Sequence, residues 1–283
     1  MSYDEWIGKS KDRNDSMAPE QLQRFEAMLD RNPNDVQAGT VLPPCAHWIY
    51  FTPVDPHSEI TEDGNAKKGE FLPPVELPVR MWAGGKIQFK KQLRAGMPAD
   101  KKSTIIKIDE KEGSSGKLCF VTIRHQINVS GSAVIDEEQQ IVYREASEQG
   151  VHPIRTMPMD IDYDWKKQKL IDSVLMFRFS ALTFNSHKIH YDYKYATEQE
   201  GYPNLVVQAP LLLVLMMNEF KSKTDGKVIE EIEYKATGPV FLGEEITITS
   251  KDVDNTRVEM RALGPDNKIA LQASVKWIYS WNQ

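Results

Sequence analysis

The chain has 283 residues, a formal net charge of −6 and a sequence pI near 5.6, with 40% hydrophobic and 27% charged residues. This composition is typical of a globular protein, and the length allows two domains that each bury a core. An acidic chain has no basic surplus to neutralise phosphates, so nucleic-acid binding is not expected. The cysteine count of 2 argues against a disulfide framework or a multi-cysteine metal site and favours a reducing, cytoplasmic location.

The start of the chain is polar and lacks both an apolar secretory core and the acid-poor character of a transit peptide. One amphipathic helix is predicted from Pro19 to Leu29, with Leu22, Phe25 and Met28 sharing a face with Leu29. The longest apolar run, residues 211–217, is far shorter than the roughly 20 residues that span a bilayer. We therefore expect no membrane association.

Residues 53–78 are rich in Pro, Gly, Asp and Glu and predict a long irregular loop, which either covers a substrate tunnel or is plain surface. Strand patterns follow, separated by Gly-containing turns in the rhythm of an antiparallel sheet. The strands are predicted at residues 87–89, 103–108, 118–127, 139–143, 245–250, 256–262 and 269–277.

The two halves of the sequence repeat one another, which favours a duplicated fold. Residues 42–48 precede an apolar run as residues 205–211 do, and residues 91–96 introduce a strand pair as residues 238–243 do. Each half thus predicts an apolar helix followed by an antiparallel meander, and residues 145–164 form the predicted linker.

An antiparallel sheet wrapped around one enclosed helix is the hotdog arrangement, and residues 211–217 are apolar on all sides as an enclosed helix requires. The fold class is therefore predicted to be α+β, a double hotdog. Its domains are predicted at residues 1–150 and 151–283.

The densest group of polar side chains lies between residues 178 and 192, where Asn185, His187, His190 and Asp192 occur close together. A histidine in such a group is more often structural than catalytic. The spacing of His187 and His190 suits zinc, but the sequence offers no third ligand, so no metal is predicted.

Two other kinds of catalytic site lack support. Ser186 is not part of the Gly-x-Ser-x-Gly motif of serine hydrolases. The glycine-rich segments 83–85 and 113–116 lack the Gly-Lys-Ser/Thr ending of a phosphate-binding loop.

Residues 178–192, together with residues 200–211, resemble the MaoC-like hydratases and type 2 hydroxyacyl-thioester dehydratases, most closely the itaconyl-CoA and mesaconyl-C4-CoA hydratases. Residues 80–85, 112–116 and 141–145 resemble the N-terminal half of that group, so the resemblance extends from about Leu42 to Trp277. It implies a cofactor-independent hydro-lyase. Such an enzyme adds water to a carbon–carbon double bond beside an acyl thioester, or forms that double bond by removing water.

The family pattern places an Asp and a His five positions apart around the water that adds to the double bond, and the resemblance assigns these places to Asn185 and His190. An amide orients a water but cannot accept its proton, so the base is expected to be His190, with a pKa near neutrality. The resemblance also gives the Ala209 N–H, at the start of the central helix, as the donor to the oxyanion. His187 and Asp192 are either helpers or purely local residues.

The implied substrate is an acyl-CoA, short and branched or dicarboxylic. A distal carboxylate would require a cation, for which Arg178 and Arg80 are candidates, and Gln208 is a further candidate for substrate binding. The first half lacks an equivalent Asn/His pair and is expected to be a degenerate repeat that shapes the acyl pocket.

Two alternatives remain at this stage. One is dehydration of 3-hydroxyacyl groups on an acyl carrier protein, and the other is a non-catalytic acyl-CoA binding or scaffold protein, which the Asp-to-Asn change makes plausible. Both a monomer and a homodimer are compatible with a fused pair of hotdogs.

Overall fold

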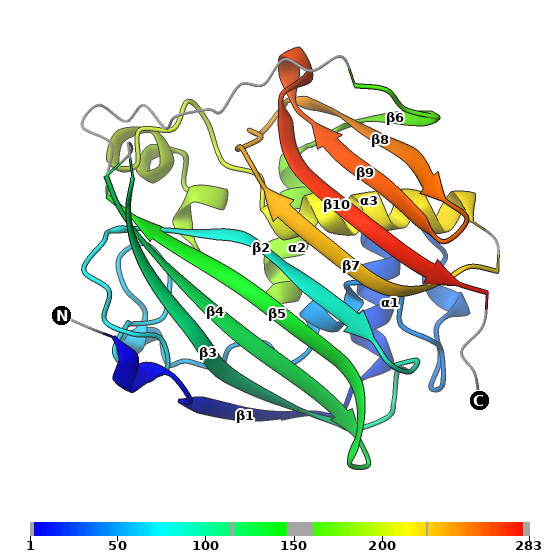
Figure 1. The fold of residues 1–283 in the computed structure, drawn as a ribbon, viewed down its shortest axis with the longest axis horizontal. Coiled ribbons are helices and arrows are strands. Elements are labelled where there is room, and N and C mark those ends of the chain that lie inside the picture. The colour runs from blue at the N-terminus through cyan, green and yellow to red at the C-terminus, as the bar shows by residue number, and fades with distance from the viewer. Residues whose placement is uncertain (1–2, 114–115, 146–160, 225, 280–283) are drawn as a thin grey trace.

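The computed structural model describes residues 3–113, 116–145, 161–224 and 226–279. In these ranges one antiparallel 10-stranded sheet forms, with the strand order β1-β3-β4-β5-β2-β7-β10-β9-β8-β6 (Figure 1). The strands are β1 Ser10–Asp15, β2 Val79–Phe89, β3 Ala99–Gly113, β4 Gly116–Val129, β5 Ser132–Arg144, β6 Trp165–Leu170, β7 Val228–Ala236, β8 Glu245–Asp254, β9 Arg257–Leu263 and β10 Ile269–Ile278.

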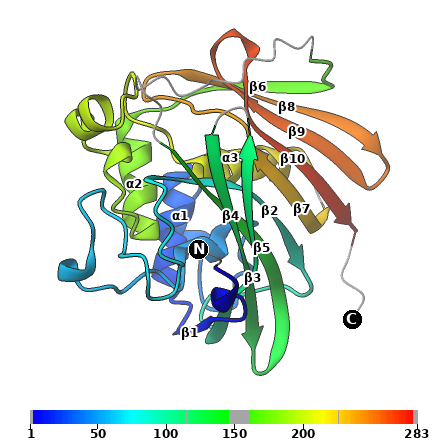
Figure 2. The same cartoon turned by 60° about the vertical axis from the view of Figure 1, so that its left-hand side comes forward.

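The two halves of the sequence supply the two halves of this sheet, and they meet where β2 pairs with β7, with Ile87 opposite Ile232. Helices α1 (Pro19–Met28), α2 (Ser173–Thr183) and α3 (Ala209–Lys223) lie on one side of the sheet (Figure 2). The arrangement is a double hotdog, as predicted. No helix in the described ranges is both long and apolar enough to cross a membrane.

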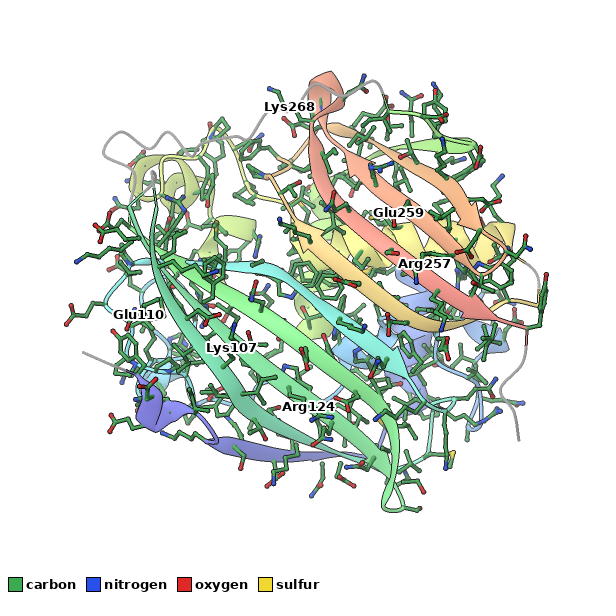
Figure 3. The ribbon with its side chains drawn as sticks, in the orientation of Figure 1. Lys107, Glu110, Arg124, Arg257, Glu259 and Lys268 are labelled. Carbon is green, nitrogen blue, oxygen red and sulfur yellow. The ribbon has the colours of Figure 1, made fainter. Side chains whose placement is uncertain are left out.

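The opposite face of the sheet carries charged side chains from both halves. Figure 3 shows Lys107, Glu110 and Arg124 on strands of the first half, Arg257 and Glu259 on β9 of the second, and Lys268 in the turn before β10. Along β10 the buried and partly exposed residues alternate, because successive strand residues point to opposite faces of the sheet.

Helix α3 is the central helix of the second half and packs against β9 and β10. Its residues from Leu211 to Met217 are all buried, which explains why the sequence shows no polar face there. Helix α1 forms where it was predicted; its residues Leu22, Phe25 and Met28 are buried, and the helix contacts α2.

The prediction of an equivalent apolar helix in the first half is wrong. After Pro43 and Pro44 the chain turns at Cys45, whose φ of 67° is left-handed, and only a short 3-10 helix, Ala46–Ile49, follows. The enclosed space is instead partly polar, since the buried carboxylate of Glu137 accepts hydrogen bonds from His47 Nε2 at 3.0 Å and Trp48 Nε1 at 3.0 Å.

The internal repeat is visible in hydrogen bonds, but in a different register from the one predicted. Isolated bridges join Val41 to Arg94 in the first half and Val206 to Phe241 in the second. These equivalent bridges shift the predicted correspondence of residues 42–48 with residues 205–211 by two positions, so that 42 corresponds to 207.

All seven predicted strands are present, and β1, β6 and β7 were not predicted. Strands β1 and β6 form the two edges of the sheet and are polar, so their sequences lack the alternation that marks a half-buried strand. Residues 146–160 of the predicted linker lie outside the described residues.

Candidate active site

The loop that carries Asn185 begins where α2 ends. Phe184, with a φ of 51°, terminates the helix, and the Asn185 N–H donates to the Ser180 carbonyl at 2.9 Å. The Asn185 side-chain oxygen then accepts a hydrogen bond from the His187 N–H at 3.0 Å. Asn185 therefore fixes the turn that leads to both histidines, and its amide N–H groups are the donors it can offer to a water.

His190 lies at the end of the 3-10 helix Lys188–His190 and is partly buried. Its Nδ1 lies 2.7 Å from the Val206 carbonyl oxygen. Because a carbonyl only accepts, the hydrogen is on Nδ1, and neutral His190 presents an unprotonated Nε2. This tautomer is the one that a general base requires.

Burial lowers the pKa of His190 to about 4, and the hydrogen bond to Val206 only partly opposes this shift. The near-neutral pKa expected from the sequence is therefore not found in the ligand-free protein. The consequence is that His190 is neutral and able to accept a proton throughout the physiological pH range.

The start of α3 lies close to His190, because Val206, which holds the imidazole, is followed three residues later by Ala209. Pro210 has no N–H, and the Leu211 and Leu212 N–H groups donate to the Gln208 carbonyl. In the described part of the chain no backbone acceptor is assigned to the Ala209 N–H, which sits at the positive end of the helix.

Gln208 is 2% exposed, and its Nε2 donates to the Met176 carbonyl at 3.0 Å and to Ser180 Oγ at 2.8 Å. These contacts tie the start of α3 to α2. Its Oε1 is buried and has no hydrogen-bond partner among the described residues. Gln208 thus positions the helix end that carries Ala209.

The Pro- and Gly-rich loop of the first half packs directly on this motif. The Lys188 N–H donates to the Asp63 carbonyl at 2.8 Å, and Ser186 Oγ donates to the Gly64 carbonyl at 2.6 Å. Gly64 is buried and has a φ of +89°. The site is therefore built from both halves of the chain.

A polar network continues from this loop to β2. Arg80 donates to Asn65 Oδ1, and Asn65 Nδ2 donates to Asp63 Oδ2 at 2.7 Å. Burial acts to raise the pKa of Asp63, but hydrogen bonds from Thr61 and Asn65 and the nearby His187 hold it below its usual value. Arg80, which the sequence marked as a candidate, is thus joined to the loop that covers the motif.

His187 lies beside His190, with their ring centroids 5.5 Å apart. Burial, together with the neighbouring His190, lowers the pKa of His187 to about 3, although Asp63 opposes the shift. Both rings are therefore neutral near pH 7. In the described ranges no group of three His, Cys, Asp or Glu side chains is placed to hold a metal ion.

Two other predicted residues lie differently. The Asp192 carboxylate accepts from the Tyr195 N–H at 3.0 Å and so begins the next helical turn. Arg178 is exposed on α2.

Sequence reasoning missed two acids near the motif. Asp63 belongs to a loop that only the fold brings to the motif. Glu200 accepts a hydrogen bond from Tyr195 at 3.2 Å, and its pKa is raised by burial and by nearby Asp63. Glu200 lies in the stretch that carried the family resemblance, which was the one available signal.

Comparison with known proteins decides the family. A family model for hydroxyacyl-thioester dehydratase type 2 matches residues 45–242. The chain belongs to this dehydratase family. It is accordingly a hydro-lyase, as the resemblance implied.

Two curated relatives are similar to this chain over most of its length. Mesaconyl-C(4)-CoA hydratase of Chloroflexus aurantiacus is 38% identical over 96% of both chains. The mitochondrial hydroxyacyl-thioester dehydratase type 2 of Schizosaccharomyces pombe is 26% identical over 78% of this chain and 81% of its own. A MaoC-like dehydratase from Phytophthora capsici has a similar structure, with a TM-score of 0.71, 11% identity and 98% coverage of each chain, which supports the fold.

Proposed function

We propose that the chain is an enoyl-CoA hydratase that adds water reversibly to a short branched or dicarboxylic enoyl-CoA, with mesaconyl-C4-CoA and itaconyl-CoA as the substrates to test first. The single observation that supports this most strongly is the His190 tautomer, because the hydrogen bond to Val206 leaves Nε2 free to accept a proton. The similarity to a mesaconyl-C(4)-CoA hydratase supports the choice of acyl group.

In the proposed mechanism, Asn185 holds a water through its amide N–H groups and His190 Nε2 takes one of its protons. In an α,β-unsaturated thioester such as mesaconyl-C4-CoA, the hydroxyl adds to the β-carbon, and the electron pair of the double bond moves toward the thioester carbonyl, whose oxygen becomes an oxyanion. The Ala209 N–H donates to this oxygen. The proton then passes from His190 to the α-carbon, so that the elements of water end on the two carbons and the imidazole returns to its neutral form.

The two halves have different proposed roles. Residues 151–283 carry the motif, the central helix and the base. Residues 1–150 supply the covering loop and Arg80. This division is supported by the Asp63 and Gly64 hydrogen bonds to the motif and by the missing central helix of the first half.

Arg80 is the proposed partner of a distal substrate carboxylate, since its charge lies close enough to His187 to lower the pKa of that ring. Arg80→Met should reduce turnover of dicarboxylic enoyl-CoAs more than that of their monocarboxylic analogues. Arg178→Met is the matched control, because Arg178 is exposed on α2. Equal losses on both substrate classes in Arg80→Met would argue against carboxylate recognition.

The main test is a panel of enoyl-CoAs, with loss of the conjugated thioester absorbance and a mass gain of 18 as readouts. Turnover of at least one of them is expected, and His190→Ala should reduce it roughly 10²–10⁴-fold. Wild-type rates in His190→Ala would remove the site assignment. Tight binding of every enoyl-CoA without turnover would favour a non-catalytic acyl-CoA binding protein.

A second candidate is dehydration of a 3-hydroxyacyl thioester on an acyl carrier protein, which the similarity to a hydroxyacyl-thioester dehydratase favours. Dehydration is the reverse of hydration, so one site can catalyse both reactions. The two functions therefore differ only in the carrier and the acyl group of the substrate. Comparing one 3-hydroxyacyl group on CoA and on acyl carrier protein tests this. A higher kcat/KM on the carrier protein would favour the dehydratase.

A further inference from the structure

A cavity of about 260 Å³ lies at the end of α3 opposite the proposed active site. It is lined by Phe220 and Thr224 near the end of α3, by Phe89 at the end of β2 and by the loops around residues 41–44 and 91–93. Phe220 is 11 residues beyond Ala209, or about 16 Å along the helix. Arg80 and Phe89, on the same strand, are about 30 Å apart. The cavity is therefore distinct from the site around His190.

The internal repeat relates this cavity to the active site. Because the Val41–Arg94 bridge corresponds to the Val206–Phe241 bridge, Val41 matches the residue that holds His190. Two residues later, Pro43 and Pro44 take the places of Gln208 and Ala209. The cavity thus occupies, in the first half, the position that the active site occupies in the second.

The residues at these matching positions explain why the cavity is not expected to catalyse the reaction. Pro44 stands where Ala209 offers its N–H, and proline has no N–H to donate to an oxyanion. No helix of length comparable to α3 begins there, since only the 3-10 helix Ala46–Ile49 follows. Binding can persist where these catalytic donors are missing.

The lining suits an apolar group attached to an anion. The wall consists mainly of apolar side chains, among which Leu42, Leu93, Ile135, Phe220 and Ile229 are buried. Lys91 and Lys221 are exposed at its rim, and Lys227 also contributes to the lining. Burial and nearby Arg31 lower the pKa of Lys221, although Glu26 opposes the shift. A cationic rim around an apolar cavity attracts phosphates and admits an acyl chain.

We propose that this cavity is a second, non-catalytic acyl-CoA site, in which the acyl chain enters the apolar interior and the phosphates lie on Lys91 and Lys221. The choice of ligand rests on the proposed function. The existence of the site rests on the cavity and the repeat.

The experiment measures binding of hexanoyl-CoA, a saturated thioester that cannot be hydrated, by calorimetry and equilibrium dialysis. The wild-type chain should bind two equivalents. Lys91→Glu with Lys221→Glu should remove one equivalent or weaken it at least tenfold, and should leave kcat on the best enoyl-CoA unchanged. A second variant, Val228→Trp, fills the cavity from β7 and should have the same effect.

The control is Lys102→Glu with Lys167→Glu, which makes the same charge change at exposed strand positions outside the cavity lining and should retain two equivalents. A wild-type stoichiometry of one that neither cavity variant alters would overturn the proposal. So would two equivalents that persist in both cavity variants. Turnover together with one equivalent that neither cavity variant alters would refute the second site alone. Two equivalents, of which the cavity variants remove one, without turnover of any enoyl-CoA would refute the proposed hydratase alone.

Discussion

The backbone of Gly64 lies against the backbone of Ser186, so close that a Cβ on Gly64 would overlap the Ser186 carbonyl oxygen. The two residues are 122 positions apart in the sequence, and the Ser186 hydroxyl donates to the Gly64 carbonyl. A loop of the first half thereby holds the loop that carries Asn185 and His190. The position of the proposed catalytic residues depends on this contact.

Gly64→Ala should therefore impair catalysis while the protein still folds. The methyl group must displace Ser186 and the adjacent His187, and a displacement of about 1 Å at a catalytic group can cost about 10² in rate. We expect a fall in kcat of that order, measured on the best substrate of the enoyl-CoA panel, with thermal unfolding monitored in parallel.

Gly69→Ala is a matched control in the same loop. Gly69 has a φ of +98°, similar to the +89° of Gly64, but a Cβ there would meet nothing within 4 Å. Both variants share the strain of a left-handed residue, about 1 kcal/mol. A comparable loss of kcat in both would show that backbone strain, and not the contact with Ser186, is responsible.

The lowered pKa of His190 predicts the pH dependence of the hydratase reaction. The base must be neutral to accept a proton, and with a pKa of about 4 it is neutral above that pH. We expect kcat/KM to stay flat from about pH 8 down to about pH 5.5 and to fall only on further acidification. A midpoint near 6.5, the ordinary value for histidine, would contradict the burial of this ring in the free enzyme.

The Asn185 side chain has two proposed functions, which substitutions can separate. Its oxygen caps the His187 N–H, and its nitrogen is proposed to hold the water. Asn185→Ala removes both and should lower kcat roughly 10²-fold. Asn185→Asp keeps an acceptor for the cap and supplies the carboxylate of the family pattern, so it should retain much more activity.

The measurement is kcat for both variants beside the wild type, with Asp192→Asn as a control that retains an acceptor for the Tyr195 N–H. Equal losses in Asn185→Ala and Asn185→Asp would mean that the amide N–H groups are essential and that the cap contributes little.

The elements that could be predicted from the sequence are those whose buried positions give a recognisable pattern of apolar residues. The run from Leu211 to Met217 is apolar on all sides because α3 is enclosed, and the inner strands alternate because one face is wet. Strand β6 is an edge with little apolar surface to bury, and α2 exposes Val174 and Phe177. Strand β6 therefore has no periodic pattern that distinguishes it from a loop, and in α2 the exposed apolar residues obscure the helical spacing of the buried ones.

The candidate site was only partly accessible to sequence reasoning. Asn185 and His190 lie in one short motif that a family resemblance marks. The contacts of Asp63 and Gly64 with that motif cross more than a hundred residues, and no local pattern encodes such a contact. The polar contact in the space of the missing helix is equally non-local, because it pairs His47 with Glu137, which is 90 positions away.

The buried Glu137 carboxylate is expected to stabilise the first half in place of that helix. It is 2% exposed and accepts from His47 and Trp48 at 3.0 Å and from Tyr234 of β7 at 3.5 Å. In Glu137→Gln the new amide N–H group cannot accept a hydrogen bond, so at least one of these buried donors would lose its acceptor. We expect a loss of roughly 2–4 kcal/mol in the free energy of unfolding at pH 7, measured by urea denaturation.

The pH dependence of this loss tests its electrostatic origin. Burial acts to raise the pKa of Glu137, but hydrogen bonding and attraction from His47, with His125 and Trp48, bring it to about 2, below the ordinary 4.5. A lowered carboxyl pKa contributes stability that is complete above 4.5 and is lost as the pH falls toward 2. The difference in the free energy of unfolding between wild type and Glu137→Gln should therefore shrink over that interval.

The exposed neighbour Glu138 provides the control, since Glu138→Gln should change stability little at any pH. A difference that stays constant down to pH 2 would point to lost packing and not to the charge of Glu137.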